Sequence, residues 1–164
     1  MNEIRVHVRR RLVVALFFLG GTIAAHSESG RTPRTEDPPA ERNARVVLAR
    51  FGDLVIAKDI GAADEFSKDG IFVGSDAGEI AIGRGQIKSL FKKMFSGPNR
   101  ISWKWQSVHA IHAGDVVWFF AEGEIVVAEP TQTVRMPYRL AGVIQRTGGR
   151  WVWRQFNGSE PPKG

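Results

Sequence analysis

The stretch from Tyr138 to Glu160, YRLAGVIQRTGGRWVWRQFNGSE, is typical of two long β-strands joined by a tight turn. Apolar and β-branched residues alternate before Gly148-Gly149, and a second alternating run leads from Trp151 to Gly158. Two glycines can take positive φ angles at no steric cost, which two-residue hairpin turns require. Strict alternation then predicts that one face of the second strand carries Trp151, Trp153, Gln155 and Asn157.

The chain around this hairpin divides into helices followed by strands. After Pro98 the sequence predicts long strands over residues 101–112, 116–128, 133–145 and 151–158. Apolar residues recur at helical spacing over residues 40–60 and 86–95. The shorter segments are predicted as a helix or turn (60–66), a turn (68–70), a strand (71–73) and a loop (75–85).

This order of elements predicts an α+β fold. The N-terminal helices are expected to pack in the concave face of a curved, mostly antiparallel sheet. Long strands favour such curvature, and Gly123 and Gly142 inside two of them allow bulges or bends.

The chain of 164 residues is long enough for one domain with a tail. Residues 1–25 have the basic start, the short apolar centre (12–19) and the small-residue exit of a signal peptide. Residues 26–39 are polar and proline-rich and are predicted to be a disordered linker. The folded domain is expected over 40–160, followed by a tail at 161–164.

Charge and composition exclude several classes of site. The net charge is +6, but residues 1–25 contribute four arginines and one glutamate, which leaves +3 for the rest. No Lys/Arg run follows Arg11, so nucleic-acid binding is not expected. The chain has no cysteine, and its histidines are spread over the signal, the linker and opposite faces of one strand (His109 and His112). Neither a metal site nor a cofactor is therefore predicted.

Three segments carry a family resemblance. They are FSKDGIFV (66–73), GRGQI (83–87) before a helix, and RWVWRQFNGSEP (150–161) at the end of the strands. In this order they resemble the SnoaL-like members of the nuclear transport factor 2-like superfamily, over residues 40–160. The resemblance implies a cone of curved sheet and helices around a pocket, often paired as a homodimer through the sheet. It does not fix the chemistry, because the superfamily includes isomerases, cyclases, dehydratases, epoxide hydrolases and non-catalytic association domains.

The catalytic residues of the ketosteroid isomerases do not carry over. Their base aspartate falls on Gly74 in this sequence, and Asp76 nearby is expected to form a turn. Their tyrosine lies on the first helix, whereas the single tyrosine here is Tyr138, on a strand. The similar strand of the calcium/calmodulin-dependent kinase II association domain has two histidines, where this chain has the amides Gln155 and Asn157.

His109 and Glu122 are the candidates for proton transfer. A histidine titrates near neutrality, although one among apolar neighbours is often a hydrogen-bonded structural residue. Glu122 is flanked by aromatic residues, so burial would raise its pKa. Alternatively it faces water or pairs with Arg139 or Arg154. A buried Arg139 would instead bind a carboxylate through two hydrogen bonds.

Alternation along the strands predicts one shared cavity. Its polar residues would be His109, Glu122, Arg139, Gln155 and Asn157, and its walls Trp118, Trp153, Phe51 and Val55. Two functions remain open. The first is a dimeric module that binds a small, partly apolar ligand, with a carboxylate as one option. The second is a cofactor-free isomerase, cyclase or hydrolase that uses His109 and Glu122. A bulge near Gly123 or Gly142 would reverse the faces.

The N-terminal segment generates the first prediction. We expect a bacterial protein that is exported to the periplasm or secreted, with a mature N-terminus just after Ala24 or Ala25. N-terminal sequencing of the protein from its native host checks this. The alternative, an uncleaved anchor in the inner membrane, is less favoured because residues 12–25 are shorter than the about 20 residues that a spanning helix needs. Full-length protein in the cytosol would contradict both.

Overall fold

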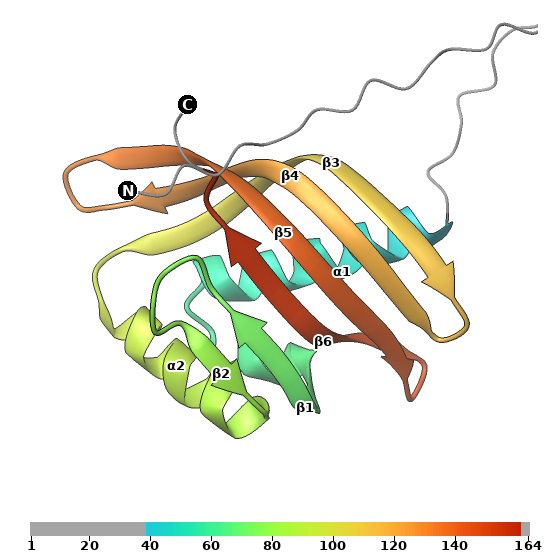
Figure 1. Cartoon of the computed structure of the whole chain (residues 1–164). Coiled ribbons are helices and arrows are strands. Elements are labelled where there is room, and N and C mark those ends of the chain that lie inside the picture. The colour runs from blue at the N-terminus through green and yellow to red at the C-terminus, as the bar shows by residue number, and fades with distance from the viewer. Residues whose placement is uncertain (1–38, 162–164) are drawn as a thin grey trace, which may run out of the picture. The chain divides into compact units, whose positions relative to one another are not determined.

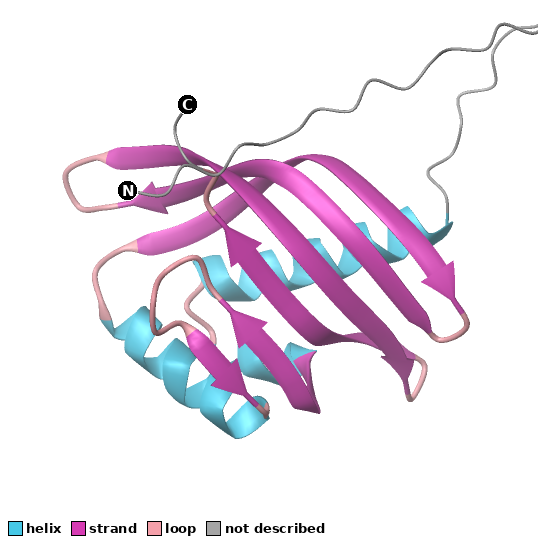
Figure 2. Cartoon of the chain, in the orientation of Figure 1, coloured by secondary structure: helices cyan, strands magenta, loops and turns pink. Residues whose placement is uncertain are grey.

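The computed structural model describes residues 39–161 (Figures 1 and 2). It contains α1 (Pro39–Ile56), the short 3₁₀ helix η1 (Ile60–Glu65) and α2 (Arg84–Ser96). The strands are β1 (Phe66–Val73), β2 (Ile80–Ile82), β3 (Arg100–Ala113), β4 (Val116–Ala128), β5 (Thr133–Thr147) and β6 (Arg150–Ser159). The predicted signal peptide, linker residues 26–38 and residues 162–164 lie outside the described residues. No helix in the described part is long and apolar enough to cross a membrane.

The six strands form one curved sheet in the order β2-β1-β6-β5-β4-β3. All neighbours are antiparallel except β1 and β6, which are parallel. Figure 1 shows α1 passing behind the long strands, and α2 packs against η1, β1 and β2. We call the face that α1 covers the inner face and the opposite one the outer face. The predicted α+β fold, with helices in the concave face of a mostly antiparallel sheet, is confirmed.

Helix α1 is placed by its apolar stripe. Pro39 at the first position and Glu41 in the first turn suit a helix start, because the first N–H groups have no helical acceptor and the dipole favours an acid there. The residues that recur every three or four positions are buried against the sheet: Ala44, Val47, Leu48, Phe51 and Val55. Burying each large side chain contributes about 1.5–3 kcal/mol.

Two short predictions on the β1 side are wrong. The expected turn at 68–70 lies inside β1, where the pairing with β6 is irregular between Phe66 and Ile71. A Cβ at Gly70 would lie 3.2 Å from the Trp153 carbonyl oxygen, so glycine there allows the two strands to approach. The expected loop at 75–85 contains β2, a three-residue edge strand. Such a strand is defined by its pairing with β1 and has almost no sequence pattern of its own.

Two bulges decide which side chains reach the inner face. In β3 the register shifts at Gln106, since Trp105 pairs with Gly123 and Ser107 with Glu122. A Cβ at Gly123 would lie 2.0 Å from the Lys104 carbonyl oxygen, so only glycine permits this close approach. Each bulge adds one unpaired residue and so reverses the alternation beyond it.

The second bulge lies in β6 at Arg154. There Ile144 pairs with Trp153 and Val143 with Gln155, so one residue of β6 has no counterpart in β5. Trp153 therefore faces inward, whereas Gln155 faces outward. The predicted single face for the alternating residues of this strand is wrong for that reason.

A buried acid ties α1 and β6 to η1. Glu65 is 5% exposed, and its carboxylate accepts hydrogen bonds from Arg50 Nε and, at 2.9 Å, from Arg150 Nη2. Arg50 also donates to the Trp151 carbonyl oxygen at 2.7 Å. A buried carboxylate is stable only when it is paired and hydrogen-bonded, so both arginines are needed to keep Glu65 inside.

Candidate functional site

Most residues predicted for the site lie on the outer face. These are His109, Trp118, Glu122, Arg139, Gln155 and Asn157. The sheet register joins them, because Glu122 lies opposite Arg139, and Val143 lies between Trp118 and Gln155. Trp118 is 52% exposed, and the viewer of Figure 1 looks onto this face.

The other three lie on the inner side and are packed into the core. Phe51, Val55 and Trp153 are 1%, 3% and 0% exposed. The prediction that all nine residues share one cavity is therefore wrong in its geometry. The bulges at Gln106 and Arg154 move the polar residues beyond them to the outer face. The roles predicted for these residues remain untested predictions.

Glu122 and Arg139 pair with each other on the outer face. Arg139 Nε lies 3.1 Å from Glu122 Oε1, and their side chains are 52% and 46% exposed. A pair this open to water stabilises a protein by at most about 1 kcal/mol. Arg139 is thus not the buried anchor for a carboxylate that the sequence suggested.

The inner face instead bounds a cavity of about 220 Å³, where β1, β4 and β6 end and β3 and β5 begin. Its apolar wall consists of Phe72, Met94, Ile101, Trp103, Ile125, Val127 and Met136. Its polar side chains are those of Ser75, Asp76, Glu79, Tyr138 and Glu160. An apolar enclosure with a few convergent polar groups is the usual form of a small-molecule site.

Two glycines make room for the ionisable groups of this cavity. A Cβ at Gly74 would lie 1.9 Å from Glu79 Oε2, and a Cβ at Gly158 would lie 1.8 Å from the Tyr138 hydroxyl. The two glycines directly follow Val73 and Asn157, which pair in the parallel β1–β6 ladder. The carboxyl group of Glu79 therefore fills the space that a side chain at Gly74 would occupy.

The environment shifts the pKa values of both groups. Burial is the main reason that the pKa of Glu79 is raised, and the nearby charges of Asp76 and Glu160 raise it further. Burial also raises the pKa of Tyr138, and the Glu79 charge adds to this. Ionisable groups perturbed in this way within a cavity are candidates for binding or proton transfer.

Trp103 forms the wall between the cavity and a second depression. Its indole Nε1 is buried and makes no hydrogen bond. The same N–H nevertheless lies near enough to the Tyr138 hydroxyl to oppose the rise in the Tyr138 pKa.

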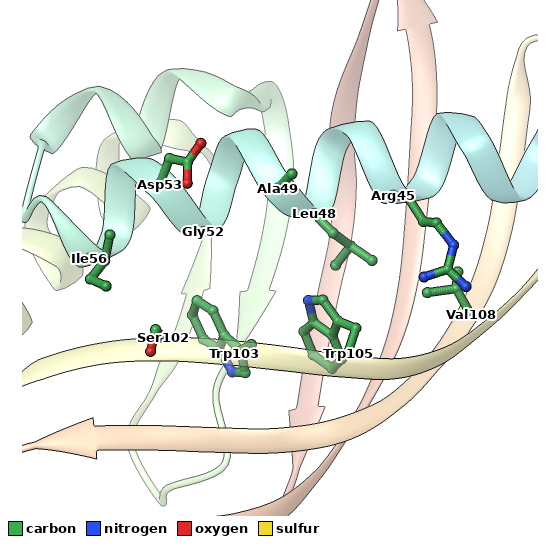
Figure 3. Close-up of a pocket in the computed structure, with 10 residues that line it drawn as sticks. All are labelled: Arg45, Leu48, Ala49, Gly52, Asp53, Ile56, Ser102, Trp103, Trp105 and Val108. Atoms are coloured by element: carbon green, nitrogen blue, oxygen red, sulfur yellow. The ribbon is translucent and has the colours of Figure 1, made fainter. Parts of the chain in front are cut away.

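The second depression is a groove of about 430 Å³ between α1 and β3 (Figure 3). Trp103, Trp105 and Leu48 form its apolar floor, and Arg45 and Asp53 stand toward its ends. A Cβ at Gly52 would meet no atom within 4 Å, so the groove is open to solvent there. The ionisable groups with raised pKa values line the cavity and not this groove.

No set of three or more His, Cys, Asp or Glu side chains within residues 39–161 is placed to hold a metal ion.

Comparison with known proteins identifies the family. The model of the SnoaL-like domain matches residues 45–163. The chain belongs to the SnoaL-like family. This agrees with the described fold and confirms the resemblance inferred from residues 40–160. A comparison with functionally curated proteins gives no match.

Solved structures similar to this SnoaL-like domain share its fold at low sequence identity. A proposed aromatic ring hydroxylase of Novosphingobium aromaticivorans has a TM-score of 0.67 at 17% identity, with 78% of this chain and 94% of that chain covered. A proposed dehydratase of the NTF2-like family from Streptomyces avermitilis has a TM-score of 0.64 at 14% identity, with coverages of 75% and 96%. An NTF2-like protein with a cystatin-like fold, also from Novosphingobium aromaticivorans, has 0.62 at 14%, with coverages of 75% and 82%. Identities this low show the fold alone.

Sequence reasoning missed Glu79 and undervalued Tyr138. Glu79 stands in a segment predicted to be a loop, and it reaches the cavity because the backbone of Glu79 pairs with Gly74 at 2.8 Å. Tyr138 precedes Arg139, so alternation alone puts it on the face opposite to that predicted for the site. One signal in the sequence could have pointed to Glu79. Gly74 has no side chain, which leaves space there for the side chain of another residue.

The raised pKa of Tyr138 leads to a direct test. Because Tyr138 is the single tyrosine, the tyrosinate absorbance of the protein reports this residue alone. We expect ionisation well above the ordinary pKa of 10.0. The stability that comes from keeping the phenol neutral is complete below that value and is lost as the pH rises beyond it.

Variants separate the two causes of the raised Tyr138 pKa, which are burial and the charge of Glu79. Glu79→Gln should lower the Tyr138 pKa, because it removes one negative charge, without restoring the ordinary value, because burial remains. Glu122→Gln on the outer face is the matched control and should change nothing. Titration of the folded wild type at the ordinary value would contradict the buried position of the phenol.

Proposed function

We propose that this SnoaL-like domain binds a small, partly apolar molecule in the cavity on its inner face. The observation that carries the proposal is the meeting of Glu79 and Tyr138, both with raised pKa values, in an otherwise apolar enclosure. Burying these groups costs free energy, and a ligand that hydrogen-bonds to them offsets that cost.

A second candidate is a cofactor-free enzyme that transfers a proton in the same cavity. A carboxyl group whose pKa is raised toward neutrality is a suitable general acid or base, and Glu79 fits that description in direction. The Tyr138 hydroxyl would hydrogen-bond to the substrate. The original candidates, His109 and Glu122, lie on the outer face, away from the cavity. In this candidate function Glu79 takes the role first predicted for them.

We also propose that the protein is exported and forms a homodimer through the outer face. Export rests on the signal-like residues 1–25, which lie outside the described residues. The dimer rests on three large apolar side chains of β3 and β4, Ile111, Trp118 and Phe120, which are 69%, 52% and 39% exposed. Several such side chains together usually mark an interface.

Binding is tested by thermal unfolding of the protein with a library of small ring compounds. Compounds that bind should raise the melting temperature, since a ligand at a hundred times its Kd adds about 2.7 kcal/mol to the unfolding free energy. At least one of the two cavity variants, Glu79→Gln or Tyr138→Phe, should weaken each of these hits tenfold or more. Gly52→Leu, which places a side chain in the α1–β3 groove, is the control and should not.

The same variants separate binding from catalysis. If a bound compound is also converted, Glu79→Gln should lower kcat by about 10²–10⁴, the usual contribution of general acid–base catalysis. Compounds that still bind both cavity variants but no longer bind Gly52→Leu would show that the binding site is the groove. They would contradict the proposal.

The dimer is tested by light scattering. We expect the wild type to be dimeric at micromolar concentration and the double variant Trp118→Ser/Phe120→Ser to be monomeric. Both residues are exposed in the monomer, so the far-UV spectrum should be unchanged. Lys88→Ser on the exposed side of α2 is the control for general surface changes. A monomeric wild type at tens of micromolar would contradict this interface.

A further inference from the structure

The cavity is lined by three side chains that can be charged near neutral pH, and all three are acidic. They are Asp76, Glu79 and Glu160, and none of the described lining residues is Lys, Arg or His. The rest of the chain has a net positive charge, +3 when residues 1–25 are left out, so the acidic lining is not a property of the overall composition. The nearby charges of Asp76 and Glu160 raise the pKa of Glu79, so the three carboxyl groups are close enough to interact.

We propose that the cavity selects a small apolar molecule that carries a protonated amine and that it rejects carboxylates. This inference rests on the proposed function, because it names the ligand class of the same cavity. It replaces the carboxylate option suggested by the sequence, for which Arg139 was the anchor. Arg139 lies on the outer face and is paired with Glu122.

The hydrogen-bonding groups of the cavity are mainly acceptors. The Ser75 hydroxyl donates to Glu160 Oε1 at 2.8 Å, which holds Glu160 at the cavity. Glu79 Oε2 accepts from the Asp76 backbone N–H at 3.4 Å, and the Ser75 backbone N–H also acts on this carboxylate. A carboxylate can accept about four hydrogen bonds and donates none when ionised. An ammonium group with three donors complements this set, and a ligand carboxylate does not.

Aromatic rings complete the match to a cation. Phe72, Trp103 and Tyr138 all line the cavity, and the rings of Trp103 and Tyr138 lie 6.3 Å apart. The negative face of an aromatic ring attracts an ammonium group by about 0.5–2 kcal/mol, depending on desolvation. The volume of about 220 Å³ limits the ligand to a single substituted ring or its equivalent, since one water takes about 30 Å³. A metal ion is not the favoured occupant, because the described carboxylates form no group placed to hold one.

The proposal fixes the sign of the pH dependence. An ammonium group is bound best when Glu79 is ionised, so affinity should rise with pH through the Glu79 titration. The groups facing Glu79 are Asp76 from the same loop, Glu160 after β6 and Tyr138 on β5. All three are acidic groups, so none of them reverses the sign.

Three matched probes test the ligand class by calorimetry at neutral pH: benzylamine, benzyl alcohol and benzoate. They share one ring and differ in charge. We expect benzylamine to bind at least tenfold more tightly than benzyl alcohol, and benzoate to bind most weakly. Glu79→Gln should weaken benzylamine about ten- to a hundredfold, the usual effect of one charge-assisted hydrogen bond, and benzyl alcohol less than threefold.

Controls keep the test decisive. Glu122→Gln removes an outer-face carboxylate and should leave the binding of all three probes unchanged. If Glu79→Gln does not fold, Glu160→Gln, at the exposed edge of the cavity, replaces it with the same expected direction.

The possible failures are distinguishable. Equal or tighter binding of benzyl alcohol or benzoate would overturn the preference for an amine and leave the cavity as a binding site. The inference would also be overturned if benzylamine bound Glu79→Gln and Glu160→Gln as tightly as the wild type and failed to bind Gly52→Leu. If none of the three probes binds the folded wild type, both this inference and the proposed function are overturned.

Discussion

The packing of one aromatic ring from α1 against the inner face holds the described domain together. Phe51 is 1% exposed and contacts rings from α2 and from three strands: Phe66, Phe91, Trp103, Trp153 and Phe156. Because β6, β5 and β4 lie between β1 and β3 in the sheet, the sheet must curve around α1 for rings of both strands to reach Phe51. Each aromatic pair adds about 0.5–1.5 kcal/mol beyond its buried area. The contact thus fixes both the position of α1 and the curvature of the sheet.

The curved sheet contains two bulges, and the bulges separate the chemistry of the two faces. At Gln106 and Arg154 the alternation reverses, so the tryptophans of β3 and β6 stay inside while His109 and Gln155 turn outward. The outer face receives polar groups and exposed apolar side chains, which suits assembly. The inner face keeps the large rings and leaves a small cavity where they end.

The cavity owes its character to residues that contribute little to the packing of the fold. The backbone at Gly74 and Gly158 leaves space for the ends of Glu79 and Tyr138, and Ser75 holds Glu160 beside them. Loops and strand ends can change in this way without disturbing the core, so one cone can host different ligands and reactions. In this member of the SnoaL-like family, the charged side chains that line the cavity are all acidic.

The sequence by itself determined the fold class, both α-helices and the four long strands. These depend on local periodicity: the stripe that includes Phe51 repeats at helical spacing, and Gly148-Gly149 marks the hairpin. The family resemblance followed from the same order of elements. Each of these features is specified by residues that are neighbours along the chain.

Only the tertiary structure decided which residues meet. A bulge adds one residue to a strand, and it forms where distant backbones approach, as Lys104 approaches Gly123. The periodicity of a strand does not show where another backbone approaches it. The predicted cavity therefore combined residues from both faces. Glu79 enters the cavity through contacts of the loop with Gly74, and β2 exists through its pairing with β1. Such contacts between separate segments, rather than the local pattern, place the ionisable groups of the site.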